Sequence, residues 1–173
     1  MKFIEHRRRS VYATTSSHLN QRGIDLARKL GKNIGPFDLV ITSTVPRAFE
    51  TAIAMGFEVN ETIKEISSIS SAVNQEIPWN AGFRKFAEVF QYNGATTLWA
   101  RKLAGVLTKI TKRIPQNGYA LVISHGGIVE GSTIGCFPNF NYSSWDRSVS
   151  YCEGVRLTIK DEKIVSIEFL GIK

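Results

Sequence analysis

Two histidines and one arginine stand where apolar stretches of the chain give way to polar loops. His6 follows the apolar opening of the chain, and Arg47 follows a second apolar stretch. His125 comes directly after a third, at 119–123. A neutral imidazole can attack phosphorus, while the planar guanidinium of arginine neutralises phosphoryl oxygens. These residue types therefore indicate phosphoryl transfer, with one histidine as nucleophile and the other hydrogen-bonded to the phosphate.

Short apolar stretches predict the strands that would hold these residues. Residues 1–4, 37–41 and 119–123 are mostly apolar and end abruptly in polar or glycine-containing loops, which is typical of buried strands. Near the end of the chain, 155–159 and 164–169 alternate apolar with polar residues on either side of a polar turn, which predicts a hairpin.

Helices are expected between these strands. Residues 20–30 and 97–114 have helical spacing of apolar residues, and Pro46 suits the first turn of a helix that runs towards Gly56. The alternation predicts an α/β fold, a three-layer α/β/α sandwich with a mostly parallel sheet and an antiparallel C-terminal addition. We expect a single domain over 1–173, with a variable insertion at about 57–93.

The loops after the strands carry motifs. Ligands bind outside the carboxyl ends of parallel strands, so the loops 5–10, 42–47 and 124–127 are expected to meet there. Residues 42–52 read TSTVPRAFETA, and residues 124–127 read Ser-His-Gly-Gly. Through these blocks, and over most of its length, the chain resembles the histidine phosphatase superfamily, the phosphoglycerate-mutase-like phosphatases.

The resemblance implies a role for each residue that matches a block. It implies a metal-independent phosphomonoester hydrolase of the histidine acid phosphatase type, which forms a phosphohistidine intermediate on His6. Arg47 and His125 would bind the phosphate, with the backbone of Gly126 nearby. No cofactor is implied, and the substrate would be a phosphorylated small molecule or a phosphoprotein.

The first block departs from the family, in which an arginine precedes the nucleophile. Here Glu5 precedes His6, and a carboxylate at that place would repel the phosphate. We expect one of Arg7, Arg8 and Arg9, preferably Arg9, to bind the phosphate instead, with Glu5 paired to an arginine. Two alternatives stay open: a catalytically degenerate module that binds a phosphate ligand or a protein on the same fold, and a phosphomutase.

A carboxylic acid must also protonate the leaving oxygen. The resemblance implies a position after the second block, where Glu65 stands between a lysine and an isoleucine. Glu61 and Glu76 are rivals, and no motif decides between the three.

The charge and composition of the chain indicate which kinds of ligand it could bind. The formal net charge of +7 favours an anionic ligand, but no basic stripe interleaved with aromatic residues indicates nucleic-acid binding.

No apolar stretch is long enough to cross a membrane, and the opening residues lack the pattern of a secretory signal, so a cytoplasmic protein is expected. The two cysteines, Cys136 and Cys152, match neither a disulfide framework nor a zinc site.

Other phosphate-handling classes fit the sequence poorly. Residues 126–133 approach the spacing of a nucleotide-binding P-loop, but Ser132 stands where that loop needs lysine. Neither cysteine is followed by the arginine-closed loop of the cysteine phosphatases. The aspartates are isolated, so a metal-dependent phosphatase is not indicated, and no metal site is expected.

Overall fold

Six strands form one mixed sheet, in the order β3-β2-β4-β1-β5-β6, in the computed structural model, which describes residues 1–172. β1 is parallel to β4, and β2 is parallel to both β3 and β4, whereas β5 is antiparallel to β1 and β6. The predicted parallel sheet with an antiparallel C-terminal addition is confirmed. The strands are β1 (Lys2–Arg8), β2 (Leu39–Ser43), β3 (Glu61–Ile63), β4 (Tyr119–Ser124), β5 (Gly154–Lys160) and β6 (Lys163–Leu170).

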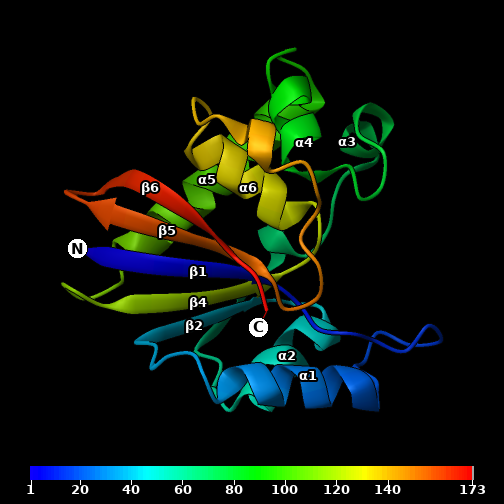
Figure 1. Ribbon diagram of the computed structural model, residues 1–173, viewed down its shortest axis with the longest axis vertical. Helices are drawn as coiled ribbons and strands as arrows, with labels where there is room; N and C mark the ends of the chain where they lie inside the picture. The colour runs from blue at the N-terminus through cyan, green and yellow to red at the C-terminus, as the bar shows by residue number, and fades with distance from the viewer. Residues whose placement is uncertain (173) are drawn as a thin grey trace.

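Helices cover both faces of this sheet, as predicted for a three-layer sandwich. α1 and α2 lie together on one face, and α4, α5 and α6 lie on the other (Figure 1). None of the helices in the described part of the chain is both long and apolar enough to cross a membrane. The helices are α1 (Gln21–Gly31), α2 (Pro46–Met55), α3 (Ser71–Glu76), α4 (Gly82–Phe90), α5 (Ala95–Thr111) and α6 (Ile128–Cys136), with 3-10 turns at Lys64–Ile66 and Tyr142–Ser144.

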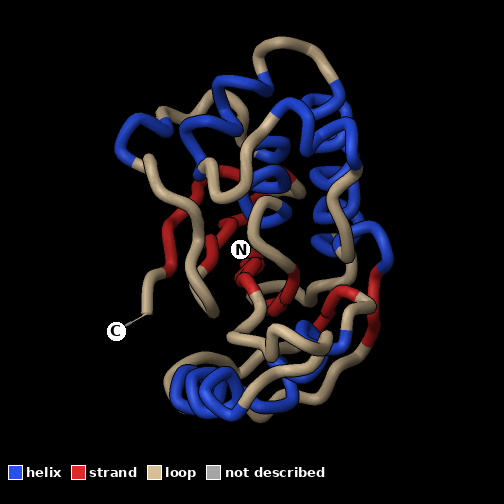
Figure 2. The backbone as a smooth tube through the Cα atoms, turned by 90° about the vertical axis from the view of Figure 1, so that its right-hand side faces the viewer, coloured by secondary structure: helices blue, strands red, loops and turns tan. Residues whose placement is uncertain are grey.

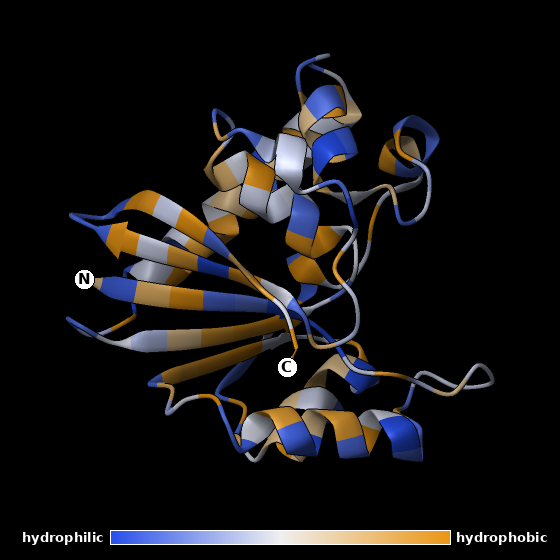
Figure 3. Ribbon diagram, viewed as in Figure 1, coloured by the Kyte–Doolittle hydropathy of each residue, from blue (hydrophilic) through white to orange (hydrophobic). Residues whose placement is uncertain are grey.

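The central strands are apolar because helices cover them on both sides. The colouring of Figure 3 shows this in β4 and β2, where hydrophobic residues follow one another, and it shows the alternating polar and apolar residues of α1. In α1, Ala27 is fully buried against the sheet, while the side chain of Arg28 is exposed. Asn20 caps the start of the helix, where its side chain accepts a hydrogen bond from the backbone N–H of Gly23 at 2.8 Å.

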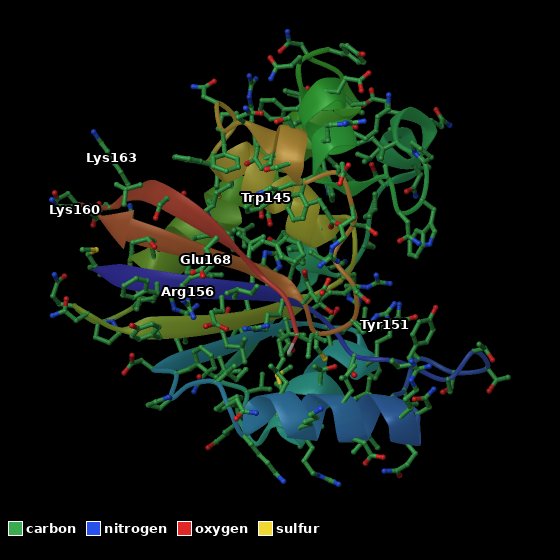
Figure 4. The ribbon with its side chains drawn as sticks, in the orientation of Figure 1. Trp145, Tyr151, Arg156, Lys160, Lys163 and Glu168 are labelled. Atoms are coloured by element: carbon green, nitrogen blue, oxygen red, sulfur yellow. The ribbon has the colours of Figure 1, made fainter. Side chains whose placement is uncertain are left out.

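The first strand differs from the prediction. The apolar pattern predicted a strand at 1–4 and a loop from Glu5, but β1 continues to Arg8. The charges can remain inside the sheet because Glu5 forms ion pairs with Arg7 at 2.8 Å and with Arg156 at 2.9 Å. Figure 4 labels Arg156 on β5, beside Glu168 of β6. The polar loop therefore starts later than predicted, and His6 is a strand residue.

Two other regions contain more regular structure than predicted. Residues 57–93, expected as a variable insertion, hold β3, a 3-10 turn, α3 and α4. Figure 2 draws helices in blue and strands in red. α6 was not predicted at all, since its glycines disfavour a helix. Those glycines permit close packing on α5: a Cβ on Gly135 would lie 2.1 Å from the carbonyl oxygen of Ala100, and a Cβ on Gly131 would lie 2.3 Å from Trp99.

Candidate functional site

A cavity of about 550 Å³ lies at the carboxyl ends of β1, β2 and β4. The segments that follow these three strands form its base, and residues 67–79 form the opposite wall. Its lining includes Arg9, Tyr12, Arg47, Trp79, His125 and Gly126. This is the edge at which the three loops were expected to meet.

The residues that follow each strand are tied together by backbone and hydroxyl contacts. The backbone N–H of Arg9 donates to the carbonyl oxygen of Ser124, at 2.8 Å, so the chain leaves β1 beside the end of β4. The next N–H, that of Ser10, donates to Thr51 Oγ1 at 2.9 Å, and this hydroxyl donates to the carbonyl oxygen of Arg47 at 2.6 Å. These contacts fix the backbone of both lining arginines.

Three arginines and two tyrosines form an alternating stack, of which Arg9, Tyr12 and Arg47 line the cavity. The guanidinium carbons of Arg9 and Arg47 lie 4.3 and 4.6 Å from the ring centre of Tyr12. The ring centre of Tyr151 lies 4.7 Å from the guanidinium carbon of Arg8 and 5.3 Å from that of Arg9. Figure 4 shows Tyr151 beyond the carboxyl ends of the strands. Each cation thus faces a negative ring surface. We call this set the arginine–tyrosine stack.

The guanidiniums of the stack lack acidic partners. Within residues 1–172, no carboxylate oxygen lies within 4.0 Å of Arg8, Arg9 or Arg47. The Nε atom of each is buried without a hydrogen-bond partner in this part of the chain. Burial lowers the pKa of Arg9 to about 10, with further lowering by the positive charges of its two neighbours. Arginine side chains stay protonated in proteins, so the stack carries three positive charges, and that of Arg8 also acts on the buried Glu130.

Arg8 lies behind the glycine loop that follows β4. A Cβ on Gly126 would lie 3.3 Å from the Arg8 guanidinium, so glycine permits this approach. Arg8 Nη1 donates to the carbonyl oxygen of Val149 at 2.7 Å. Val149 in turn donates its N–H to the buried carboxylate of Glu130, which also accepts from the N–H of Gly127. Burial raises the pKa of Glu130, a carboxyl group that the sequence analysis did not single out.

His125 reaches the cavity as a neutral ring. Burial is the largest cause, and the positive charge of Arg47 the next, of a pKa lowered to about 3. Its Nε2 is hydrogen-bonded to the hydroxyl of Ser43, the last residue of β2, at 2.8 Å. A neutral imidazole in this place can act as a hydrogen-bonding group for a ligand without adding a fourth positive charge.

His6, the expected nucleophile, does not line the cavity. Its side chain is 0% exposed, inside the sheet, and burial lowers its pKa to about 3. Both ring nitrogens are occupied: Nε2 is hydrogen-bonded to Ser124 Oγ at 2.6 Å and Nδ1 to Ser132 Oγ at 2.9 Å. The structure brings Arg9, Arg47, His125 and Gly126 together and leaves His6 outside that group, because β1 is longer than predicted.

The three consecutive arginines point to three different places. Arg7 turns towards Glu5 and donates to the carbonyl oxygen of Cys152. Arg8 lies behind Gly126, and Arg9 lines the cavity. Glu5 is therefore an ion-pair partner within the sheet and does not face the cavity.

None of the three candidate acids is among the residues that line the cavity. Glu65 is exposed, in the 3-10 turn before α3. Glu61 forms an ion pair with Arg113. Glu76 accepts from the backbone N–H groups of Ala95 and Thr96 at 2.9 and 2.8 Å, and hydrogen bonding from Thr96 is the main cause of its lowered pKa. Glu76 thus stabilises the start of α5.

Sequence reasoning missed the aromatic members of the site. Tyr12 stands in a loop that pairs back on itself, with Tyr12 bridged to Leu19, and Tyr151 is far away in the sequence. The only feature of the sequence that could have pointed to Tyr12 is the run of basic residues shortly before it. In the described part of the chain, no three His, Cys, Asp or Glu side chains gather in a way that could hold a metal ion.

Comparison with known proteins agrees with this fold. The family model of the histidine phosphatase superfamily (branch 1) matches residues 4–170. A search of curated protein sequences found no significant match.

Several solved structures are similar over nearly the whole chain. Phosphoserine phosphatase from Entamoeba histolytica, in complex with 3-phosphoglyceric acid, has a TM-score of 0.73 at 18% identity, covering 100% of this chain and 98% of that chain. Phosphoglycerate mutase from Bacillus anthracis has a TM-score of 0.68 at 15% identity, covering 97% and 92%. The alpha-ribazole phosphatase from Shigella flexneri has a TM-score of 0.64 at 17% identity, covering 99% of both chains. At these identities the likeness shows the fold, which these proteins use for phosphoryl-group chemistry.

Proposed function

The chain belongs to the histidine phosphatase superfamily, and on that basis we propose that its cavity binds phosphorylated ligands without transferring the phosphoryl group to His6. One observation carries the proposal. The β1 residue that reaches the cavity is Arg9, whereas His6 is buried in the sheet. Where the family resemblance requires a nucleophilic imidazole after the strand, this chain presents a guanidinium, which cannot act as a nucleophile because it stays protonated.

The charges in the cavity support anion binding. Arg9 and Arg47 line it, Arg8 lies behind Gly126, and none of them has a carboxylate partner in residues 1–172. A phosphate can accept paired hydrogen bonds from guanidinium groups, which are among the stronger hydrogen bonds in proteins. Hence a phosphate dianion would satisfy donors that otherwise remain buried without partners.

The expected hydrolysis, and the alternative phosphomutase, would both require a phosphorylated His6. To attack phosphorus, the His6 ring would have to break its hydrogen bond to Ser124 or Ser132 and move out of the sheet. Nucleophile and substrate must also approach to about 3–3.5 Å for reaction. The binding module, left open by the sequence, requires neither movement.

Calorimetric titration with inorganic phosphate tests the binding site. The native chain should bind phosphate, and Arg47→Gln should weaken binding by about tenfold or more, the loss of one charge-assisted contact. Arg28→Gln is the matched control, because it removes the same charge from the exposed surface of α1. Binding that is absent in the native chain, or equally weak in both variants, would contradict the proposal.

Phosphate release from a generic aryl phosphate, with chelator present, tests turnover across about pH 5–8. An aryl oxygen leaves easily, so the assay does not depend on which carboxyl group would supply a proton. We expect no turnover above background from the native chain. Turnover that is lost in a folded His6→Ala variant would restore the phosphohistidine mechanism and overturn the proposal.

A further inference from the structure

We propose that the preferred ligand of this cavity is a diphosphate group. The inference rests on the proposed function. It concerns how many negative charges a ligand needs in order to balance the positive charges of the site. It is carried by the arginine–tyrosine stack, which holds three guanidiniums at one cavity without a carboxylate partner in residues 1–172.

The stack carries one positive charge more than a monoester phosphate matches. A phosphomonoester carries about −2 at neutral pH, and a diphosphate ester carries one charge more. Arg8, Arg9 and Arg47 together contribute three positive charges, while His125 is neutral because its pKa is about 3. A bound monoester would therefore leave one buried guanidinium without a phosphoryl group of its own, which a second phosphate group would supply.

Arg9 is the residue that supplies the additional charge. Its side chain is 3% exposed, its neighbour Arg8 is 7% exposed, and the two share the ring of Tyr151. Their mutual repulsion is one of the causes that lower the pKa of Arg9. A compact anion with two adjacent phosphoryl groups would relieve this repulsion, since each group can accept from a different guanidinium.

The donors around the cavity form two neighbouring groups. Arg8 lies behind Gly126, whereas Arg9 and Arg47 stack on Tyr12. We infer one phosphoryl subsite in each group. A diphosphate offers several peripheral oxygens at both centres, which matches the paired N–H donors of guanidinium better than a single phosphate does.

The test compares pyrophosphate with inorganic phosphate by calorimetric titration at about pH 7.5 and physiological ionic strength, where screening is moderate. The native chain should bind pyrophosphate about tenfold or more tightly than phosphate, the worth of one charge-assisted contact. Arg9→Gln should weaken the binding of both anions, but it should weaken pyrophosphate binding more and so remove most of that preference. Arg9→Lys, which keeps the charge, should retain it, and Arg28→Gln should behave as the native chain.

The outcomes separate this inference from the proposed function. Failure of the native chain to bind either anion contradicts both. Equal affinity for the two anions, or an equal loss of both in Arg9→Gln, overturns the diphosphate assignment and leaves phosphate binding intact. If Arg9→Gln does not fold, the native chain and Arg9→Lys still decide the matter through their ratio of the two affinities.

A third arm uses 3-phosphoglycerate, which also adds one negative charge to a phosphate but places it on a carboxylate. If pyrophosphate binds more tightly than 3-phosphoglycerate, the second subsite prefers a phosphoryl group, as proposed. Tighter binding of 3-phosphoglycerate would overturn the assignment in favour of a phosphorylated carboxylic acid.

Discussion

The guanidinium of Arg9 lies over the ring of Tyr12, with its central carbon 4.3 Å from the ring centre. Arg47 contacts the same ring, at 4.6 Å. A carboxylate in this position would neutralise the arginines and occupy their N–H donors. An aromatic ring stabilises each cation through its π face and leaves those donors available, so it holds the charges in place for an anionic ligand.

Tyr12→Leu should therefore weaken phosphate binding. Loss of the two cation–π contacts, worth about 0.5–1 kcal/mol each at partly exposed sites, predicts an affinity lower by about fivefold to thirtyfold. Tyr12→Phe keeps the ring and should bind almost as the native chain does. Calorimetric titration of the two variants makes the comparison, and an equal loss in both would assign the effect to the hydroxyl group instead.

The pH dependence of binding should follow the ligand. His125 has a pKa of about 3, lowered mainly by burial, so it stays neutral from pH 5 to 8. Phosphate monoesters gain their second negative charge near a pKa of about 6. Affinity should increase from about pH 5 to pH 7.5 and then level off. A phosphonate with a different second pKa should shift the curve by the same amount, whereas an unchanged curve would indicate a titrating protein group.

Folding stability should fall as the solution is acidified. His6 and His125 both have a pKa lowered from 6.5 to about 3 by burial, so below pH 6.5 the unfolded chain binds protons that the folded chain does not. The free energy of unfolding should then decrease by about 1.4 kcal/mol per pH unit for each histidine, down to the folded-state pKa.

Urea denaturation between about pH 7.5 and 5 measures this slope, a range in which most carboxylates stay ionised. In a folded His6→Asn variant, the free energy of unfolding should change less with pH, because only His125 would still contribute to the slope. The same slope in the variant and in the native chain would show that His6 is not the source.

Gly127 should be intolerant of a side chain. Its φ of +83° is strained for other residues, and a Cβ would lie 2.7 Å from Ile69 Cδ1. Gly127→Ala should lower the free energy of unfolding by about 1–3 kcal/mol and disturb the loop beside Arg8. Gly105 in α5 is the matched control, since no atom lies within 4 Å of its added Cβ. Gly105→Ala should increase stability by about 0.5–1 kcal/mol.

Much of the fold could be predicted because its strands and long helices have regular local patterns. The stretch at 119–123 became β4, and the hairpin at 155–169 became β5 and β6. β1 could not be bounded from local pattern. Glu5 and Arg7 look like loop residues until Arg156, far away in sequence, completes their ion pairs inside the sheet.

The wrong end predicted for β1 also limited how much of the site could be predicted. Arg47, His125 and Gly126 follow strands whose ends were predicted to within two residues, and all three line the cavity. His6 was assigned to a loop that begins only after Arg8. The tyrosine contacts could not be predicted, since Tyr151 meets Arg8 and Arg9 only through the tertiary fold.

The arginine–tyrosine stack also has a consequence for the speed of binding. Its positive charge, beside a cavity on a chain of formal net charge +7, creates a potential that draws anions inward before any contact forms. Such focusing increases association rates by about 10- to 1,000-fold over uncharged encounters, and salt abolishes the advantage. The protein would capture a scarce anionic metabolite rapidly, and its dissociation rate alone would then set how long the bound state lasts.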